Sequence, residues 1–580
     1  MSPTQMQTLA KDPVWQALIQ AQANTPRISD PTFLLSAEDF SSLNELSKTI
    51  ELLTMQPSAA CRFPARKRYI ERQLTISLSN FSMSDCVDYT EFSTLAPADK
   101  IYLVYTSENL TQASSMMGHV MLKIEGTNNK ANAVSHAVSF FTELDSINAA
   151  KILWESLFIG KQSFFKVSPY QEHIDQYLNA EQRNVWEYQL DFNPEQLQLI
   201  HAHLWELKNA TIPYFFHTYN CATLTQLLLA IGQPTMSPEP NAWVTPLDVV
   251  KSAQANKLIS TTTVIAANKW KIRMLQDAHS LRNNPIPDPK IDSRNLANLA
   301  SRPTESQFLS LKLLESFNLY QLQNGAIDRT TFNDNKGILK AFGQDQNLEQ
   351  FDIDLSAYKQ PIAAPNDSQF SVGMRQIDSE NWFQIHYMPA SRRLEDDNRQ
   401  FFSESALELS SLSLLVSAQN TKIELEEWSL YAMRSLVPYE PFTGGVSSQL
   451  RIGVQQHVNP YLQRALALDI YSGIGLAVKL SHDLLLYSQM NVGLGFSEGH
   501  GYIYTRPEVG LMFYQIFDMK TLVSFSITDN QRQGDQVIKS LALTHSIYTQ
   551  QNISLHGTFE KKWTNLNEQQ SFGLYFKYLY

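Results

Sequence analysis

Residues 571–580, Ser571-Phe-Gly-Leu-Tyr-Phe-Lys-Tyr-Leu-Tyr580, end the chain with a large apolar or aromatic residue at every second position. In a β-strand, residues two apart share one face. From about residue 368 onward, segments of about ten residues repeat this alternation between Asp, Asn, Gly and Gln turns. In one of them the same face carries four aliphatic residues, Ile474, Leu476, Val478 and Leu480. The C-terminal part of the chain is therefore expected to be antiparallel β-structure.

Two architectures give this pattern, a soluble β-sandwich and an outer-membrane barrel with lipid-facing apolar residues and a polar interior. Three features favour the barrel. The pattern predicts about twelve strands, an even number, with lengths near the nine to eleven residues that cross a bilayer when tilted. The last strand ends on an aromatic residue, as outer-membrane barrels of bacteria commonly do. Small inward-facing residues would relieve crowding in a small barrel, namely Gly473, Gly475, Gly493 and Gly495.

Composition excludes several classes of protein. The chain has 580 residues, is 43% hydrophobic and carries 46 Lys and Arg against 57 Asp and Glu, a net charge of −11. Wholesale disorder is excluded, and nothing favours a nucleic-acid partner, which would need a basic face. We find no stretch apolar enough for a transmembrane helix and no signal peptide at the N-terminus. If the barrel is correct, a signal peptide has been removed and the residues before the barrel face the periplasm.

The period of the hydrophobic pattern divides the chain into four parts. Residues 1–95 are mainly helical in pattern, and residues 96–270 mix short strands with helices. Residues 271–365 form a helical and linker region with a proline-rich stretch at 284–289. Residues 366–580 form the expected barrel.

Cys221 has the most suggestive surroundings of the three cysteines. It opens a predicted helix, Cys221-Ala-Thr-Leu-Thr-Gln-Leu-Leu-Leu229, and a helix N-terminus favours the thiolate and could hold an oxyanion. A buried structural cysteine would look the same. A base must come from elsewhere, and His119 follows a glycine at the start of a predicted strand. His136 lies on the next strand, where a hairpin could place it beside His119.

Two motifs resemble the Gly-His and Asn-Cys signatures of the Lnb-type periplasmic domain family. They are Ser115-Met-Met-Gly-His119-Val-Met-Leu-Lys-Ile124 and Tyr214-Phe-Phe-His-Thr-Tyr-Asn220-Cys221-Ala-Thr-Leu224. The resemblance runs from about residue 12 to 235. It implies an α+β chain whose first part is a permuted papain-like (NlpC-type) domain with helical additions, followed by an antiparallel outer-membrane barrel. It also implies Cys221 as nucleophile and His119 as its base, with His136, or alternatively Ser139, as the third polar group.

The activity implied by the resemblance is that of a periplasmic thiol acyltransferase, anchored in the outer membrane and acting on a phospholipid or lipoprotein. A cell-envelope cysteine hydrolase (an amidase, peptidase or deacylase) and a noncatalytic outer-membrane binding protein remain alternatives. No cofactor and no metal is required. In the periplasm we expect a disulfide between Cys61 and Cys86, which leaves Cys221 free.

Overall fold

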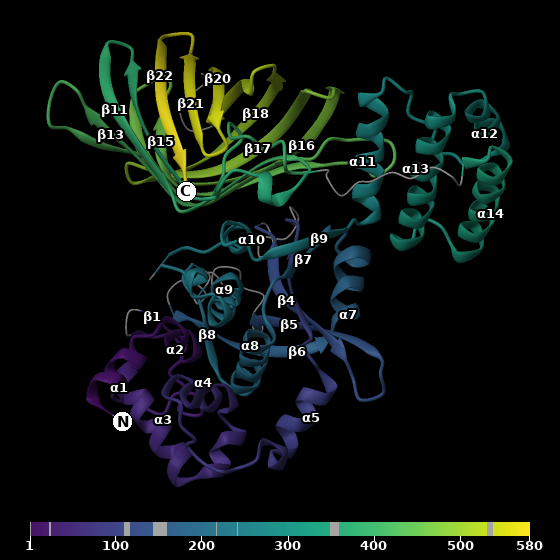
Figure 1. Cartoon of the computed structure of the whole chain (residues 1–580). Coiled ribbons are helices and arrows are strands. Elements are labelled where there is room, and N and C mark those ends of the chain that lie inside the picture. Colours follow the sequence, from purple (N-terminus) through teal and green to yellow (C-terminus); the bar gives the residue numbers. More distant parts are fainter. Residues whose placement is uncertain are drawn as a thin grey trace. The chain divides into compact units, whose positions relative to one another are not determined.

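The computed structural model describes residues 2–22, 25–108, 117–142, 159–215, 217–239, 242–348, 359–530 and 537–580 (Figure 1). The chain forms two compact units, Met1–Ala267 and Asn268–Tyr580. The helical region that follows residue 267 thus belongs to the same unit as the C-terminal strands. Each unit is described by itself.

The first unit begins with helices that start at capping side chains. Asp12 accepts the Val14 N–H at 2.8 Å at the start of α2, and Ser41 accepts the Asn44 N–H at 3.0 Å at the start of α3. A 2.00 Å S–S bond joins Cys61 to Cys86 and confirms the expected disulfide. The elements of this part are α1 (Pro3–Ala10), α2 (Pro13–Leu18), β1 (Ala21–Gln22), β2 (Thr25–Pro26), α3 (Ser42–Met55), α4 (Pro64–Leu74) and α5 (Val87–Leu95).

A buried arginine ties these helices to the rest of the unit. Arg66 in α4 forms ion pairs with Glu45 in α3 at 2.8 Å and with Glu206 in α8 (Pro194–Leu207) at 3.2 Å, and all three side chains are shielded from solvent. Glu206 also accepts the backbone N–H groups of Ala65 and Arg66 at the start of α4, at 2.7 and 3.0 Å. Because a buried charge is costly unless paired, these contacts fix α4 against α8.

A seven-stranded antiparallel sheet forms the centre of the unit, in the order β8-β6-β5-β4-β3-β7-β9. Helix α7 packs through Tyr170 and Ile174 on the face that carries Met121, and Figure 1 shows α7 and α9 on opposite sides of the sheet. Covering both faces explains why consecutive residues of β4 are buried. The remaining elements are β3 (Lys100–Thr106), β4 (His119–Thr127), β5 (Ala133–Thr142), β6 (Lys161–Pro169), α7 (Tyr170–Asp175), β7 (Val185–Leu190), α8 (Pro194–Leu207), β8 (Ile212–Tyr214), α9 (Cys221–Gly232), α10 (Pro246–Ala255) and β9 (Ile259–Ile265).

The second unit starts with helices packed around an apolar core that includes Leu275, Leu313 and Phe342. Arg273 joins them to the connection between two strands, residues 437–446, by donating to the carbonyl oxygens of Pro438 and Gly444 at 3.3 and 3.1 Å. None of the helices in the described ranges is both long and apolar enough to cross a membrane. Their bounds are α11 (Asn268–Leu281), α12 (Ser293–Ala300), α13 (Thr304–Gln323) and α14 (Arg329–Asp345).

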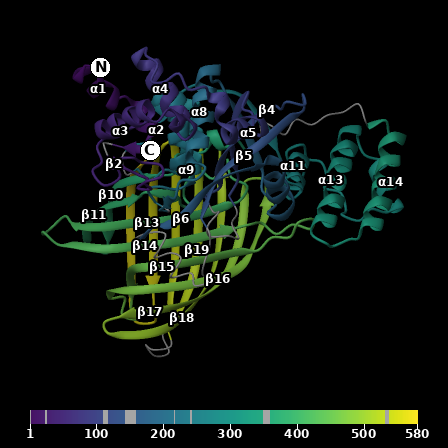
Figure 2. The same ribbon diagram turned by 90° about the horizontal axis from the view of Figure 1, so that it is seen from below.

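The remaining strands of the described chain form one closed antiparallel barrel. Consecutive strands pair as hairpins, and β10 pairs with β22 from Gln369↔Leu579 to Ile377↔Ser571, which closes the ring. The short β12 continues the position of β11, because both pair with β13. The described strands therefore occupy twelve positions around the barrel, and closure excludes the sandwich. In Figure 2 the green strands of one wall lie across the yellow strands of the opposite wall.

The bounds of these strands follow the chain order around the ring. They are β10 (Gln369–Ile377), β11 (Glu380–Met388), β12 (Ala390–Arg392), β13 (Glu404–Ser417), β14 (Ile423–Leu436), β15 (Ser447–Val458), β16 (Arg464–Ser481), β17 (Leu484–Ser497), β18 (His500–Gln515), β19 (Met519–Asn530), β20 (Ile538–Gln550), β21 (Ile553–Trp563) and β22 (Glu568–Leu579).

Side chains alternate between the two sides of the barrel wall, as the sequence pattern predicts. In β17, Met490 and Val492 are about half exposed on the outer surface, whereas Asn491 between them is fully buried inside. Two of the inner glycines, Gly493 and Gly495, lie against tyrosine rings: a Cβ on Gly493 would lie 2.2 Å from the Tyr504 ring. The predicted role of small inner residues in relieving crowding is therefore confirmed at this position.

Candidate active site

Cys221 is the first residue of α9, as the sequence predicts, and Asn220 is the cap that starts the helix. The Asn220 side-chain oxygen accepts the N–H groups of Ala222 and Thr223 at 2.9 and 3.0 Å, and its amide donates to the Val244 carbonyl at 3.0 Å. Asparagine is among the preferred residues at this position. The cap fixes the backbone at Cys221. This residue as a whole is partly exposed and, among the described cysteines, is the one outside a disulfide.

His119 opens β4, directly after a glycine that the backbone requires. Gly118 has φ +84°, and a Cβ there would lie 2.6 Å from the Thr106 carbonyl oxygen. Thr106 is also the residue opposite His119 in the β3–β4 pairing. The Gly-His motif thus holds the imidazole at the end of the strand.

The sulfur of Cys221 meets β4 at the residue that follows His119. Burial raises the pKa of the Cys221 thiol to about 11, whereas hydrogen bonds from the backbone N–H groups of Val120 and Ala222 and the charge of Arg183 act in the opposite direction. The pairing of β4 with β5 ends at Leu122↔Val138. Beyond it, the edge of β4 near Val120 is open to the N-terminus of α9.

The imidazole shares these surroundings. Burial lowers the pKa of His119 to about 3, and the positive charges of Arg183 and His173 add to this effect. The His119 ring lies 6.4 Å from the Tyr177 ring, and the negative charge of a Cys221 thiolate contributes to raising the pKa of Tyr177. At neutral pH the site therefore holds a neutral thiol and a neutral imidazole, which is able to accept a proton.

Arg183 is a buried residue of the site that no sequence motif reveals. Its guanidinium lies 5.2 Å from the centre of the Tyr177 ring. The residue is only 2% exposed. Its hydrogen bonds go to the carbonyl oxygens of Ser107 and Thr106, the Thr106 hydroxyl and the Glu181 carboxylate, at 2.6, 3.4, 2.7 and 2.9 Å. The charge is thereby fixed beside the cross-strand partner of His119.

His136 lies away from this pair. It is opposite Ile124 in the β4–β5 register, five residues along the strand from His119. Residues directly opposite each other share a face, so His136 lies on the face of Ile124. Because His119 and Ile124 are an odd number of residues apart, they point to different faces, and the two rings lie on opposite faces of the sheet. The hairpin therefore does not bring His136 beside His119. The sequence pattern predicted the two strands but not the register between them, and the register decides which side chains meet.

Ser139, the alternative to His136, is on the same face as His119. Its neighbour Ala137 lies opposite Lys123, and alternation places Ser139 on the face that Lys123, Met121 and His119 share. Ser139 is buried and pairs with Lys166 of β6 in the register. Of the two candidates for the third role, Ser139 is the one placed on the face of the imidazole.

The two histidines of α8 have structural partners. His201 lies 2.8 Å from the Ala96 carbonyl oxygen, and His203 lies 3.3 Å from the Gln20 amide. Both are buried. Among the described residues, no group of three or more His, Cys, Asp or Glu side chains is arranged to hold a metal ion.

Family comparisons match three parts of the chain. Residues 88–256 match the Lnb N-terminal periplasmic domain, which contains both His119 and Cys221. Residues 359–579, the barrel, match a domain of unknown function (DUF7840), and residues 7–73 match another (DUF7843). A search of curated protein sequences finds no match.

Solved structures that resemble this chain are outer-membrane proteins and porins. A loop-deletion mutant of OmpT, an outer membrane protein of Vibrio cholerae, is 9% identical and covers 36% of this chain and 97% of its own, with a TM-score of 0.20. The KdgM porin in complex with disordered oligogalacturonate is 8% identical and covers 37% and 99%, with a TM-score of 0.24. The NanC porin is 8% identical and covers 37% and 100%, with the same TM-score of 0.24.

The family match and the closed barrel with its apolar outer surface lead to one assignment. Apolar residues outside and polar residues inside are the pattern of a barrel that spans an outer membrane. Residues 88–256 therefore match the Lnb N-terminal periplasmic domain and are placed in the periplasm, and the same chain carries an outer-membrane barrel.

Proposed function

We propose that the first unit is a thiol acyltransferase of permuted papain-like fold, with Cys221 as nucleophile and His119 as base. The order of the two groups supports the fold, since the histidine strand precedes the cysteine helix and that helix packs against an antiparallel sheet. The family match over residues 88–256 contains both groups. The proposed substrates are a phospholipid or lipoprotein ester as donor and an amine as acceptor.

One observation carries this proposal. The Cys221 sulfur, at the N-terminus of a helix, is a hydrogen-bond acceptor for the backbone N–H of Val120, the residue next to His119. The sulfur therefore lies one residue from the proposed base at the end of β4, and the charge of Arg183 acts on both groups. A nucleophile that can reach a base is what thiol catalysis needs. The N–H groups at the start of α9 would then stabilise the negative oxygen of the tetrahedral intermediate.

The chemistry would run in two steps. The sulfur attacks the ester carbonyl carbon while its proton passes to His119, and the C–O bond breaks as His119 protonates the departing alcohol. An amine then attacks the Cys221 thioester, the C–S bond breaks, and the proton returns to the sulfur through His119. A water molecule in place of the amine would give hydrolysis with the same residues.

The neutral Cys221 thiol and the neutral His119 imidazole support a mechanism in which the proton is transferred as the sulfur attacks the substrate. A thiol with a pKa of about 11 is largely protonated at neutral pH, and an imidazole with a pKa of about 3 is unprotonated. The thiolate would therefore form as the substrate binds, and His119 is already in the state that accepts the proton. Anchoring by the barrel would raise the local concentration of a lipid donor.

Transfer of a labelled acyl chain tests the proposal. The full-length protein is incubated in vesicles of phosphatidylethanolamine with radiolabelled acyl chains, and acyl-protein is detected by gel before and after hydroxylamine. We expect a hydroxylamine-labile label that is lost in Cys221→Ala and strongly reduced in His119→Ala. His136→Ala is the matched control, a histidine of the same sheet placed on the other face, and it should keep the label.

Adding an acceptor separates transfer from hydrolysis. With a lipopeptide that has a free α-amine, a transferase moves the label to the peptide, whereas a hydrolase releases free fatty acid. An unlabelled wild-type protein, or equal labelling of the Cys221→Ala variant, would contradict the proposal.

A further inference from the structure

The chain between β12 and β13, residues 393–403, folds into the interior of the barrel; we call it the in-folded segment. It lies at the base of the barrel, the end at which β10 begins and β22 ends. Asp396 and Asn398 in this segment are 3% and 1% exposed. Polar residues that are so completely buried in a connection between strands need partners inside the barrel.

Those partners come from four strands of one side of the ring, β18, β19, β20 and β22. The Lys577 ammonium of β22 donates to the Asp396 carboxylate at 2.6 Å, and the Lys520 ammonium of β19 donates to the Asp396 carbonyl oxygen at 3.0 Å. The Tyr548 hydroxyl of β20 donates to the Glu395 carbonyl at 2.8 Å, and the Asn398 N–H donates to the Tyr514 hydroxyl of β18 at 3.2 Å. A segment bonded to β18, β19, β20 and β22 at once must cross the lumen.

Ion pairs between strands on opposite walls strengthen this closure. Lys520 on β19 lies 2.7 Å from Glu404 at the start of β13, six positions away around the ring. Arg434 on β14 lies 2.6 Å from Glu508 on β18, four positions away. These pairs place charged side chains across the lumen at two points.

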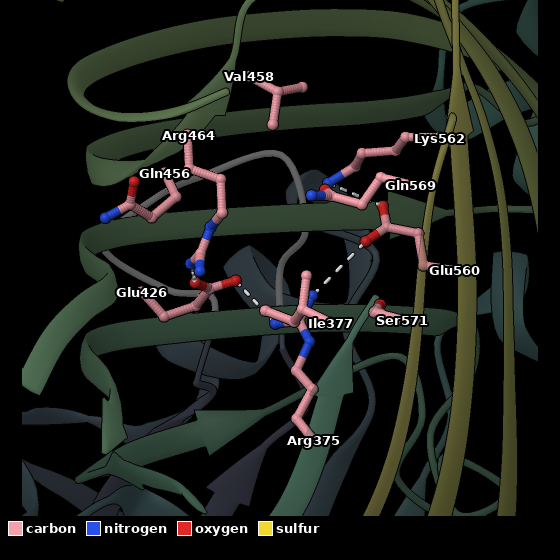
Figure 3. A pocket seen from close by; sticks show the side chains of 10 residues that line it. All are labelled: Arg375, Ile377, Glu426, Gln456, Val458, Arg464, Glu560, Lys562, Gln569 and Ser571. Atoms are coloured by element: carbon pink, nitrogen blue, oxygen red, sulfur yellow. Dashed lines mark hydrogen bonds and ion pairs between the residues drawn. The ribbon is translucent and has the colours of Figure 1, made fainter. Parts of the chain in front are cut away.

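A second closure lies at the rim, the opposite end of the barrel. Arg375 of β10 lies 2.7 Å from Glu426 of β14 and 3.6 Å from Glu560 of β21 (Figure 3). Glu426 also pairs with Arg464 of β16, and Glu560 pairs with Lys562 at 3.1 Å. We call these five residues the rim cluster. The cavity left beside them is about 20 Å³, which holds about one water molecule.

Between the two closures the lumen is partly hollow. A cavity of about 260 Å³ lies among side chains of β10, β11, β20, β21 and β22, including His386, His556 and Tyr575. Barrels with few strands are filled by their own side chains, whereas those with many leave a channel. At twelve positions, closure therefore depends on the in-folded segment and the rim cluster.

We propose that the barrel is a sealed membrane anchor and not a diffusion pore, closed at its base by the in-folded segment and at its rim by the rim cluster. An ion that enters would have to break several charge pairs held out of bulk water, which is costly. This inference is independent of the chemistry at Cys221, since it concerns the second unit alone.

Conductance in planar lipid bilayers tests the seal. We expect no stepwise conductance from the full-length wild-type protein. One variant replaces residues 394–402 by a short Gly-Ser linker, and a second carries Arg375→Ala with Glu426→Ala, which removes both members of a pair. Each variant alone leaves one closure intact and should show no conductance. The variant that combines both changes should give discrete conductance steps.

A matched control removes an ion pair outside the lumen. Arg282 and Glu305 lie 2.7 Å apart on the exposed surface of the helices, and the Arg282→Ala, Glu305→Ala variant should stay silent. Heat-dependent migration on gels shows that each barrel is folded. Stepwise conductance of the wild-type protein would overturn the proposal, and so would a combined variant that is folded and silent.

Discussion

The Tyr219 hydroxyl donates a hydrogen bond to the side-chain oxygen of Gln20 at 2.9 Å, across 199 positions of the sequence. Both residues are buried. The Gln20 amide donates to the Ala17 carbonyl at 3.1 Å and lies 3.3 Å from the His203 ring. Tyr219 is two residues before Cys221. This bond therefore attaches the chain segment that leads into Cys221 to the N-terminal helices.

Replacing Gln20 by Leu should destabilise the first unit and slow acylation of Cys221. A buried Tyr219 hydroxyl without its acceptor costs about 1–3 kcal/mol. Removing both polar groups, in Gln20→Leu with Tyr219→Phe, should recover much of this loss. Thermal unfolding and acyl-enzyme formation are measured on the wild type, the two single variants and the double variant. If the two residues interact, their effects are not additive, and strictly additive effects would contradict the interaction.

Alkylation of Cys221 by iodoacetamide should rise steadily with pH. The thiolate is the reactive form, and with a pKa of about 11 its fraction increases about tenfold per pH unit in the range between about 7 and 9. A thiolate already paired with a protonated histidine would instead react at a constant rate over this range. Rates at several pH values distinguish the two states, and a plateau near neutral pH would rule out the neutral pair.

Arg183→Gln should make Cys221 less reactive at any given pH. The charge of Arg183 lowers the pKa of both Cys221 and His119, so its removal raises both. The thiolate fraction at pH 8 then falls, and alkylation slows several-fold. Arg68→Gln is the control, because the Arg68 side chain is on an exposed part of α4 and should leave the rate unchanged. Equal rates in both variants would mean that Arg183 does not act on the sulfur.

Local sequence patterns predicted the elements that hold the site. The alternation after residue 368 indicated the barrel, and Asn220 before an apolar run indicated a helix that begins at Cys221. The disulfide was likewise predictable, since Cys61 and Cys86 are near each other in sequence while Cys221 is isolated. Each of these features depends on neighbouring residues, which a single sequence displays.

The features that the sequence did not reveal depend on distant contacts. The place of His136 follows from a strand register, and a change of one residue moves a side chain to the other face. Arg183 and Gln20 reach the site through partners far away in the chain, and neither lies in a recognisable motif. The in-folded segment, residues 393–403, reads as an ordinary polar connection until its partners on four strands are known.

The disulfide should contribute to stability without being needed for chemistry. It closes a loop with a sequence separation of 25, and such a crosslink is worth about 3 kcal/mol in the chain-entropy view. Cys61→Ser with Cys86→Ser should therefore lower the melting temperature of the first unit. The label on Cys221 should persist at temperatures where the variant is folded. Thiol titration of the unfolded, unreduced wild-type chain should give one group, and three groups would contradict the bond.

Gly493→Ala should weaken the barrel far more than Gly557→Ala does. A Cβ at Gly493 would lie 2.2 Å from the Tyr504 ring, whereas nothing lies within 4 Å of a Cβ at Gly557. Neither glycine needs a left-handed backbone, so the two variants differ mainly in space. Overpacking of this kind costs about 1–3 kcal/mol. Urea titrations followed by heat-dependent migration give the unfolding midpoints. We expect a clear decrease for Gly493→Ala and little change for Gly557→Ala, and equal midpoints would show that the Tyr504 ring can move aside.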